Sequence, residues 1–268
     1  MRISFIVRMM FATLLVVQLT SCYSPTEGCL DPESTNYSIS GDNECEDCCE
    51  YPVFKLSIFH ENMDTTFQLN DTITNDLGQK VSLVDFVYLL SDFKILSGES
   101  TDEVSDSVSL NVSDGVDYVK DDIIRVTRDE FTYDVGTITF DGNTSEISFK
   151  VGLIALLNEN RFTTEIEDHP LTNDPDSLYQ SDSGTYVFQR IKVAQGFNFL
   201  DTLVYDINTS VEVIFPLEFE SVRGSDKTII IEAQYDKWFD GIDFGFSTKE
   251  DVENAININT IKVFRQKN

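Results

Sequence analysis

The chain is poor in the residues from which metal centres and catalytic sites are usually built. Its 268 residues include two histidines, one tryptophan and five cysteines. With only His60 and His169, a metal site made of several histidines from one molecule is excluded by counting. No Gly-x-Ser-x-Gly elbow, phosphate loop, His-Glu-x-x-His helix or Gly-x-Gly-x-x-Gly fingerprint occurs. Glu165, Glu167 and Asp168 have no spacing that supports acid–base pairing, so we predict that the protein is not an enzyme.

Positive charge is also scarce. There are 19 lysines and arginines against 47 aspartates and glutamates, which gives a formal net charge of −28 at pH 7. Such a surface repels the phosphates of nucleic acids, so we expect no nucleic-acid partner. The charge does not identify a ligand, because a dispersed acidic surface is most often a solubility feature.

A long apolar run occurs only near the start of the chain. Arg2 and Arg8 are followed by an apolar stretch from Met9 to Val17, and then by a short segment that ends in Cys22. This layout is typical of a secretory signal, and the stretch is shorter than the about 20 residues of a membrane-spanning helix. The segment Leu19-Thr20-Ser21-Cys22 resembles the lipobox of bacterial lipoproteins.

We therefore predict that residues 1–21 are removed and that acylated Cys22 attaches the protein to a membrane. Tyr23 and Ser24, which follow it, include no aspartate of the kind that retains some lipoproteins in the inner membrane. An outer-membrane lipoprotein, facing either the periplasm or the cell surface, is the expected location. Acyl chains contribute about 0.8 kcal/mol per buried methylene, so several chains hold a protein stably.

The remaining cysteines are confined to residues 22–52. Cys29, Cys45, Cys48 and Cys49 lie in an exported and hence oxidising setting, where they predict two disulfides. A bridge between the adjacent Cys48 and Cys49 would be strained, so Cys29 is expected to pair with Cys48 or Cys49, and less readily with Cys45. Zinc binding by Cys45 and Cys48 is the alternative, which the compartment disfavours. We interpret residues 22–52 as an acidic, disulfide-stapled spacer, and its sequence resembles a short module of exported Bacteroidetes proteins.

Residues 53–268 carry a strand-like pattern. Several segments alternate apolar and polar residues, and turn sequences such as Asp141-Gly142-Asn143 separate them. Only Gly152–Asn160 and Lys249–Ile256 suggest helix, the second with Thr248 as its cap and Asp251 three residues on. We predict an all-β fold, an antiparallel β-sandwich with one or two short helical turns. The expected strands are Val53–Phe59, Ser82–Leu96, Thr137–Phe140, Glu146–Val151, Thr185–Val193, Val211–Phe219 and Lys227–Ala233.

Three single residues are candidates for special roles. His169 follows a run of carboxylates and could bind a metal or hydrogen-bond to a neighbouring acid. His60, at the end of the first expected strand, is interpreted as structural. Trp238 is expected to anchor the core, because large aromatic side chains contribute most when they are buried.

Several short motifs in this order are similar to a known family. The matching segments are Phe67-Gln68-Leu69, Asn75–Gly78, Val81–Leu83, Phe86–Ser91, His169-Pro170-Leu171, Leu178-Tyr179-Gln180, Gly184-Thr185-Tyr186, Trp238–Gly241 and Ala255–Phe264. Together they make residues 53–265 resemble the MbnP-like family of bacterial exported proteins.

The resemblance implies a role in copper handling. Founding members of that family look like copper-associated periplasmic proteins, in which a histidine and an oxidised tryptophan hold the metal and a di-haem partner performs the oxidation. His169 matches the family histidine, while Gln180 stands where a tryptophan is usual. The resemblance thus implies copper near His169 and Tyr179 and a di-haem oxidase-like partner. The alternative is a cell-surface interaction or carbohydrate-associated module with no metal site.

Overall fold

The computed structural model describes residues 24–68, 70–98, 100–104, 106–112, 115–159, 169–172, 176–195 and 201–267. The expected signal peptide and Cys22 lie outside these residues, as do Glu165, Glu167 and Asp168. In the described part of the chain, no helix is both long enough and apolar enough to cross a membrane.

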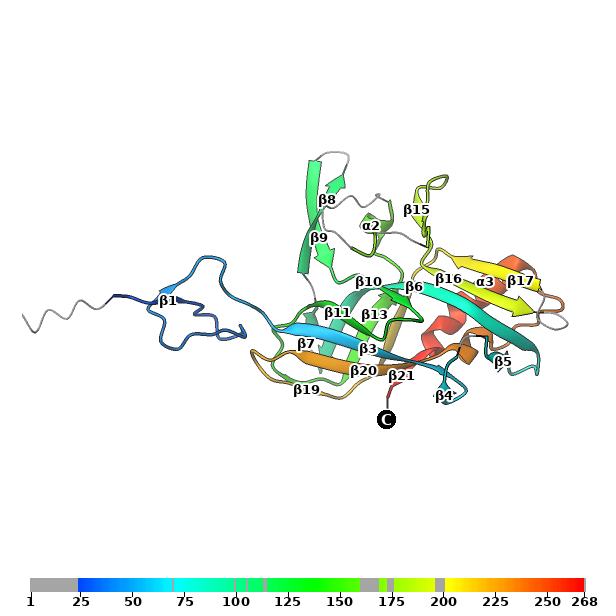
Figure 1. Cartoon of the computed structure of the whole chain (residues 1–268), viewed down its shortest axis with the longest axis horizontal. Helices are drawn as coiled ribbons and strands as arrows, with labels where there is room; N and C mark the ends of the chain where they lie inside the picture. Colours follow the sequence, from blue (N-terminus) through cyan, green and yellow to red (C-terminus); the bar gives the residue numbers. More distant parts are fainter. Residues whose placement is uncertain are drawn as a thin grey trace, which may run out of the picture.

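The stapled segment projects from one end of the main domain (Figure 1). Its short strands β1 (Glu27–Gly28) and β2 (Asn43–Glu44) pair in parallel. Disulfides join Cys29 to Cys49 and Cys45 to Cys48. Cys29 thus pairs with one of its two expected partners, and Cys45 and Cys48, the two cysteines considered as zinc ligands, are bonded to each other. The Tyr51 hydroxyl donates to Asp31 Oδ2 at 2.8 Å and ties the end of the segment back to its start.

An eight-stranded antiparallel sheet forms one layer of the sandwich. The long strand β6 occupies its centre, in the order β17-β16-β6-β13-β18, and three short strands also pair with β6. Its members are β5 (Thr72–Thr74), β6 (Lys80–Ser97), β7 (Ser100–Glu103), β10 (Ile124–Thr127), β13 (Glu146–Val151), β16 (Gln189–Gln195), β17 (Asp201–Ile207) and β18 (Val211–Pro216).

A five-stranded sheet forms the second layer, in the order β11-β3-β20-β21 with β4 beside β3. Here β3 and β20 run parallel, which the prediction of hairpin-connected antiparallel strands does not include. A parallel pair needs a long crossover, and in this chain all eight strands of the first sheet lie between β3 and β20 in the sequence. The bounds are β3 (Val53–Asn62), β4 (Thr65–Thr66), β11 (Thr132–Thr137), β20 (Lys227–Gln234) and β21 (Phe264–Gln266).

Small hairpins and short helices complete the domain. In α3 the Thr248 hydroxyl accepts the Asp251 N–H while the Asp251 carboxylate accepts from Thr248, so the expected capping box is confirmed. The paired strands are β8 (Asp106–Val112) with β9 (Gly115–Asp121), β12 (Gly142–Asn143) with β19 (Glu220–Ser221), and β14 (Tyr179–Gln180) with β15 (Thr185–Tyr186); the helices are α2 (Ala155–Glu159), η2 (Tyr235–Phe239), α3 (Lys249–Asn259) and η3 (Thr260–Lys262).

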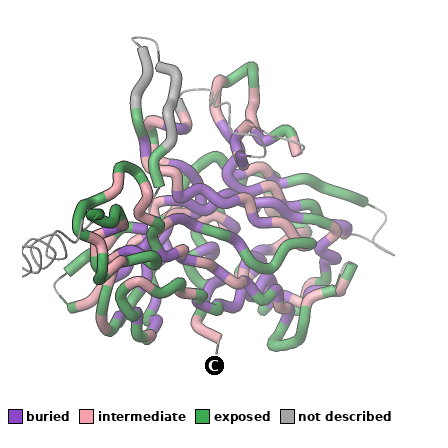
Figure 2. Tube along the Cα trace, turned by 60° about the vertical axis from the view of Figure 1, so that its left-hand side comes forward, coloured by how far each residue is buried: buried purple, intermediate pink, exposed green. Residues whose placement is uncertain are grey.

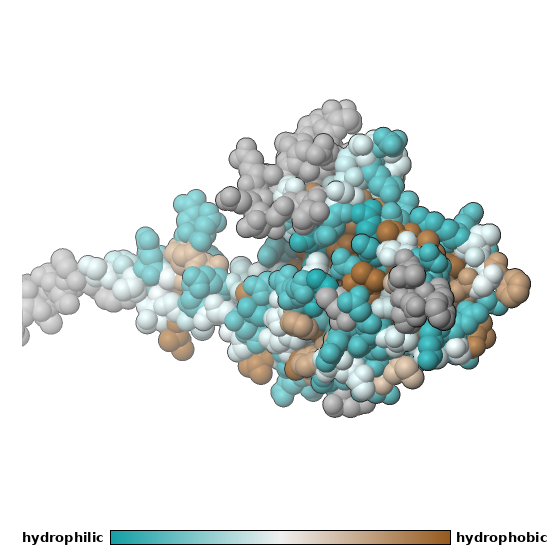
Figure 3. Space-filling model, turned by 45° about the vertical axis from the view of Figure 1, so that its right-hand side comes forward, coloured by the Kyte–Doolittle hydropathy of each residue, from teal (hydrophilic) through white to brown (hydrophobic). Residues whose placement is uncertain are grey.

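The core lies between the two sheets and confirms the predicted β-sandwich. Alternate residues of β3, namely Phe54, Leu56 and Ile58, are fully buried, whereas Phe59 on the other face is 43% exposed. Trp238 is also fully buried, as predicted. Buried positions follow the interior of both layers (Figure 2), and the surface seen in Figure 3 is mostly hydrophilic with apolar side chains in small groups.

Three strand predictions were wrong in detail. The strand expected at Val211–Phe219 is β18, which ends at Pro216, where its partner β13 begins with Glu146. The strand expected at Thr137–Phe140 lies mostly earlier in the chain, as β11, which ends at Thr137 because this residue pairs with Val53, where the partner strand β3 begins. The strand expected at Thr185–Val193 is two strands, β15 and β16. The backbone changes partners between them, since Val187 N–H donates to Leu178 and Phe188 N–H to Ile207.

Candidate functional site

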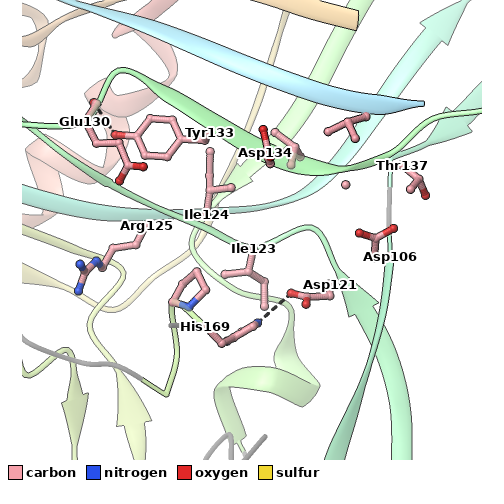
Figure 4. A pocket seen from close by; sticks show the side chains of 14 residues that line it. Asp106, Asp121, Ile123, Ile124, Arg125, Glu130, Tyr133, Asp134, Thr137 and His169 are labelled. Carbon is pink, nitrogen blue, oxygen red and sulfur yellow. Dashed lines mark hydrogen bonds and ion pairs between the residues drawn. The ribbon is translucent and has the colours of Figure 1, made fainter. Parts of the chain in front are cut away.

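A pocket of about 470 Å³ opens where β9, β10 and β11 meet the segment that carries His169 (Figure 4). The loop from β9 to β10 forms its floor, and β11 forms the opposite wall. Its polar and charged lining residues are Asp106, Asp121, Arg125, Glu130, Tyr133, Asp134, Thr137 and His169.

His169 is 4% exposed, and protein groups occupy both of its ring nitrogens. The Leu171 backbone N–H donates to Nδ1 at 3.1 Å, so Nδ1 is an acceptor and carries no proton. Nε2 therefore carries the proton, and it lies 2.8 Å from Asp121 Oδ1. This imidazole–carboxylate pair fixes the tautomer and the direction of the ring.

Two aspartates of the pocket face each other across a hairpin. Asp106 begins β8 and Asp121 ends β9, and the two are direct cross-strand partners. Like charges placed directly opposite on an antiparallel pair destabilise it. This end of the pocket therefore carries an excess of negative charge.

Other charged groups of the lining have partners at the pocket margin. Asp134 forms an ion pair with Lys55 at 3.0 Å, and Arg125 lies 3.3 Å from Asp176. The Tyr133 hydroxyl donates to the backbone carbonyl of Glu130 at 2.6 Å, and burial raises the pKa of this phenol well above its usual range. The wall formed by Glu130 and Tyr133 is thus held by hydrogen bonds.

Tyr179, the second predicted metal ligand, is not among the described residues that line the pocket holding His169. It belongs to β14, where its ring packs edge-on against Tyr186 with the ring centroids 5.0 Å apart. Gln180 follows it in the same strand. The structure brings His169 together with Asp106 and Asp121, neither of which sequence reasoning selected.

His60 lies in the core and bonds to two groups. Its Nδ1 contacts the Tyr235 hydroxyl and its Nε2 contacts the Glu130 carbonyl at 3.2 Å. Burial lowers the pKa of His60, an effect that the hydrogen bond to Glu130 partly opposes. The structural interpretation of His60 fits these contacts.

The donors of the pocket suit some metal ions better than others. An imidazole nitrogen and carboxylate oxygens match copper(II), whereas copper(I) prefers sulfur, and the described lining residues include neither cysteine nor methionine. Among the described residues, no three histidine, cysteine, aspartate or glutamate side chains are grouped closely enough to hold a metal. The donors that the pocket brings into direct contact are one imidazole nitrogen, of His169, and one carboxylate oxygen, of Asp121.

The fold and the pocket define a β-sandwich domain with an acidic, histidine-containing pocket. The MbnP family model matches residues 52–260, so the chain belongs to the MbnP family. A solved structure, MbnP from Methylosinus trichosporium, is 10% identical; the match covers 71% of this chain and 78% of that chain, with a TM-score of 0.42. No curated protein matches the chain.

Proposed function

We propose that this member of the MbnP family is a non-catalytic binding protein of the cell envelope, anchored in the outer membrane through acylated Cys22. Its pocket at His169 binds copper(II). The observation that carries the proposal is the buried imidazole of His169, held against Asp121 at the edge of an acidic pocket. A di-haem oxidase-like partner stays a prediction of the family resemblance.

A copper ion could take the position of the proton that lies between His169 and Asp121. The proton on His169 Nε2 points at the Asp121 carboxylate, and a divalent cation that replaces it meets one nitrogen and one oxygen donor. Asp106, opposite Asp121 in the hairpin, adds a further carboxylate on the same face. A cation would also relieve the repulsion between these two aspartates.

Copper titration followed by calorimetry, with elemental analysis of the dialysed protein, tests the metal site. We expect the wild-type protein to bind one equivalent of copper(II), and His169→Ala to abolish binding. Asp121→Asn should weaken binding by about 10- to 100-fold, the range for losing a group that supports a metal site. The matched control is Asp129→Asn, whose side chain is 80% exposed and which should bind like wild type.

Either of two results would contradict the copper site: no binding by the wild-type protein, or equal binding by wild type and His169→Ala. The anchor is tested separately by fractionating cells that express wild type or Cys22→Ser. Wild type should sediment with membranes and the variant should be released. An unchanged distribution would refute the lipid anchor without affecting the metal site.

A further inference from the structure

A buried tyrosine and a buried histidine form a hydrogen-bonded pair that the pocket does not use. His60 is 4% exposed and Tyr235 is fully buried, and the Tyr235 hydroxyl bonds to His60 Nδ1. The other ring nitrogen, Nε2, faces the Glu130 carbonyl at 3.2 Å, and a carbonyl can only accept. The proton of the neutral ring is therefore on Nε2, which leaves Nδ1 as acceptor and makes the phenol the donor.

Aromatic rings enclose this pair. The Trp238 indole stacks on the Tyr235 ring with centroids 4.6 Å apart and an interplanar angle of 22°, and Trp238 is fully buried. The Tyr88 hydroxyl lies 3.4 Å from the Tyr235 hydroxyl. Among side chains that contain no sulfur, tyrosine and tryptophan are the most easily oxidised by one electron. Here Tyr235 and Trp238 lie in contact and away from water.

Loss of an electron alone would leave a cation radical on Tyr235 in apolar surroundings, which is costly. Burial raises the pKa of Tyr235, so loss of the proton alone is also disfavoured. Moving the phenol proton to His60 while the electron leaves avoids both species. The positive charge then sits on an imidazolium whose Nε2–H donates to the backbone carbonyl oxygen of Glu130.

We propose that Tyr235 and His60 form a one-electron redox site in the core of the sandwich. An outer-sphere one-electron oxidant takes one electron from Tyr235, and the hydroxyl proton moves along the existing hydrogen bond to His60 Nδ1. The products are a neutral tyrosyl radical, an imidazolium and the reduced oxidant. One electron from an outer-sphere reductant restores the phenol as the proton returns.

The electron has a short route to the surface. Phe131 is 55% exposed, and the centroid of its ring lies 5.2 Å from that of the His60 ring. An oxidant at this spot is separated from the pair by a single side chain. The redox site uses neither His169 nor Asp121, so it does not rest on the proposed copper site.

Flash oxidation with photogenerated ruthenium(III) tris-bipyridine, followed by absorption and by electron paramagnetic resonance of frozen samples, tests the proposal. Ring-deuterated tyrosine identifies the residue type of the radical. We expect a long-lived tyrosyl radical in the wild-type protein. Tyr235→Phe should remove it and leave only short-lived radicals on tyrosines that water reaches. Tyr118→Phe, which removes a tyrosine that is 74% exposed, should keep the long-lived radical.

The role of His60 has its own readout. His60→Gln keeps a polar side chain but cannot accept the proton, so it should slow the formation of the radical. Refolding in deuterated buffer places deuterium on the buried phenol, which should slow the formation of the radical in the wild-type protein. This isotope effect should be absent in His60→Gln. The redox site would be overturned if Tyr235→Phe still formed a long-lived radical. It would also be overturned if Tyr118→Phe abolished all the radicals seen in the wild-type protein. An unchanged rate and isotope effect in His60→Gln would overturn its role as proton acceptor.

Discussion

Replacing Asp122 by alanine should destabilise the domain more than any surface change of the same kind. The register between β6 and β13 shifts at Asp92 and Phe93, so their backbone N–H groups have no partner on β13. The Asp122 carboxylate, 2% exposed, accepts both, at 3.0 Å from Asp92 and 2.6 Å from Phe93. Asp92 has a positive φ of 56°, so this bulge depends on a side chain that holds it.

The size of the loss follows from these contacts. A buried polar group left without a partner costs about 1–3 kcal/mol, and Asp122→Ala leaves two of them. Burial also raises the pKa of Asp122, which means that the desolvated carboxylate itself costs stability at neutral pH and that its removal returns part of the loss. We expect a net decrease of about 2–3 kcal/mol in the free energy of unfolding.

Urea unfolding at neutral pH measures this change. Asp122→Asn keeps one acceptor oxygen and should fall between wild type and alanine. Asp129→Ala, on an exposed turn, should stay within about 0.5 kcal/mol of wild type. If Asp122→Ala is as mild as Asp129→Ala, the bulge is held by its neighbours and the reasoning from unpaired N–H groups fails.

Two further predictions concern stability. Burial lowers the pKa of folded His60, so the unfolded state takes up a proton at a higher pH than the folded state does, and the free energy of unfolding should fall as the pH is lowered. The fall should extend from about pH 7.5 to about pH 5.5, across the ordinary histidine pKa of about 6.5. The same measurement on His60→Gln isolates the contribution of His60, and an identical dependence of stability on pH in the two proteins would refute it. Gly152→Ala should cost about 2 kcal/mol or more in thermal unfolding, because φ is 127° and a Cβ would lie 2.8 Å from both Phe188 Cδ2 and Ser210 Cβ. Gly184→Ala, with φ of 70° and open space, should cost about 1 kcal/mol, and equal losses would contradict the steric argument.

Local sequence patterns predicted the parts of the fold that depend on local rules. The strand Glu146–Val151 matches β13 at both ends, and the capping box of α3 follows from Thr248 and Asp251 alone. The parallel pairing of β3 with β20 has no such signature, because strands from opposite ends of the domain meet only in the folded protein. The hairpin of β8 and β9 was missed because polar residues fill much of its sequence.

For the candidate site too, the sequence predicted one residue and missed its partner. His169 stands out in a chain with two histidines, and the structure places it in the pocket. Its partner Asp121 is 48 residues earlier in the chain, and nothing distinguishes it from the other acids of so acidic a sequence. An acid next to His169 in sequence was the natural expectation, and the fold supplied a distant one.

The position of β3 has a mechanical consequence. A pull on the N-terminal end passes through the Cys29–Cys49 bond, which relieves residues 30–48 of load, and then along the axis of β3. Because β3 lies between β11 and β20, such a force loads two ladders of hydrogen bonds in shear at once, instead of peeling a single strand from an edge. The domain is therefore joined to residues 24–52 through a strand that resists extraction, and the anchor proposed at Cys22 would pull along that strand.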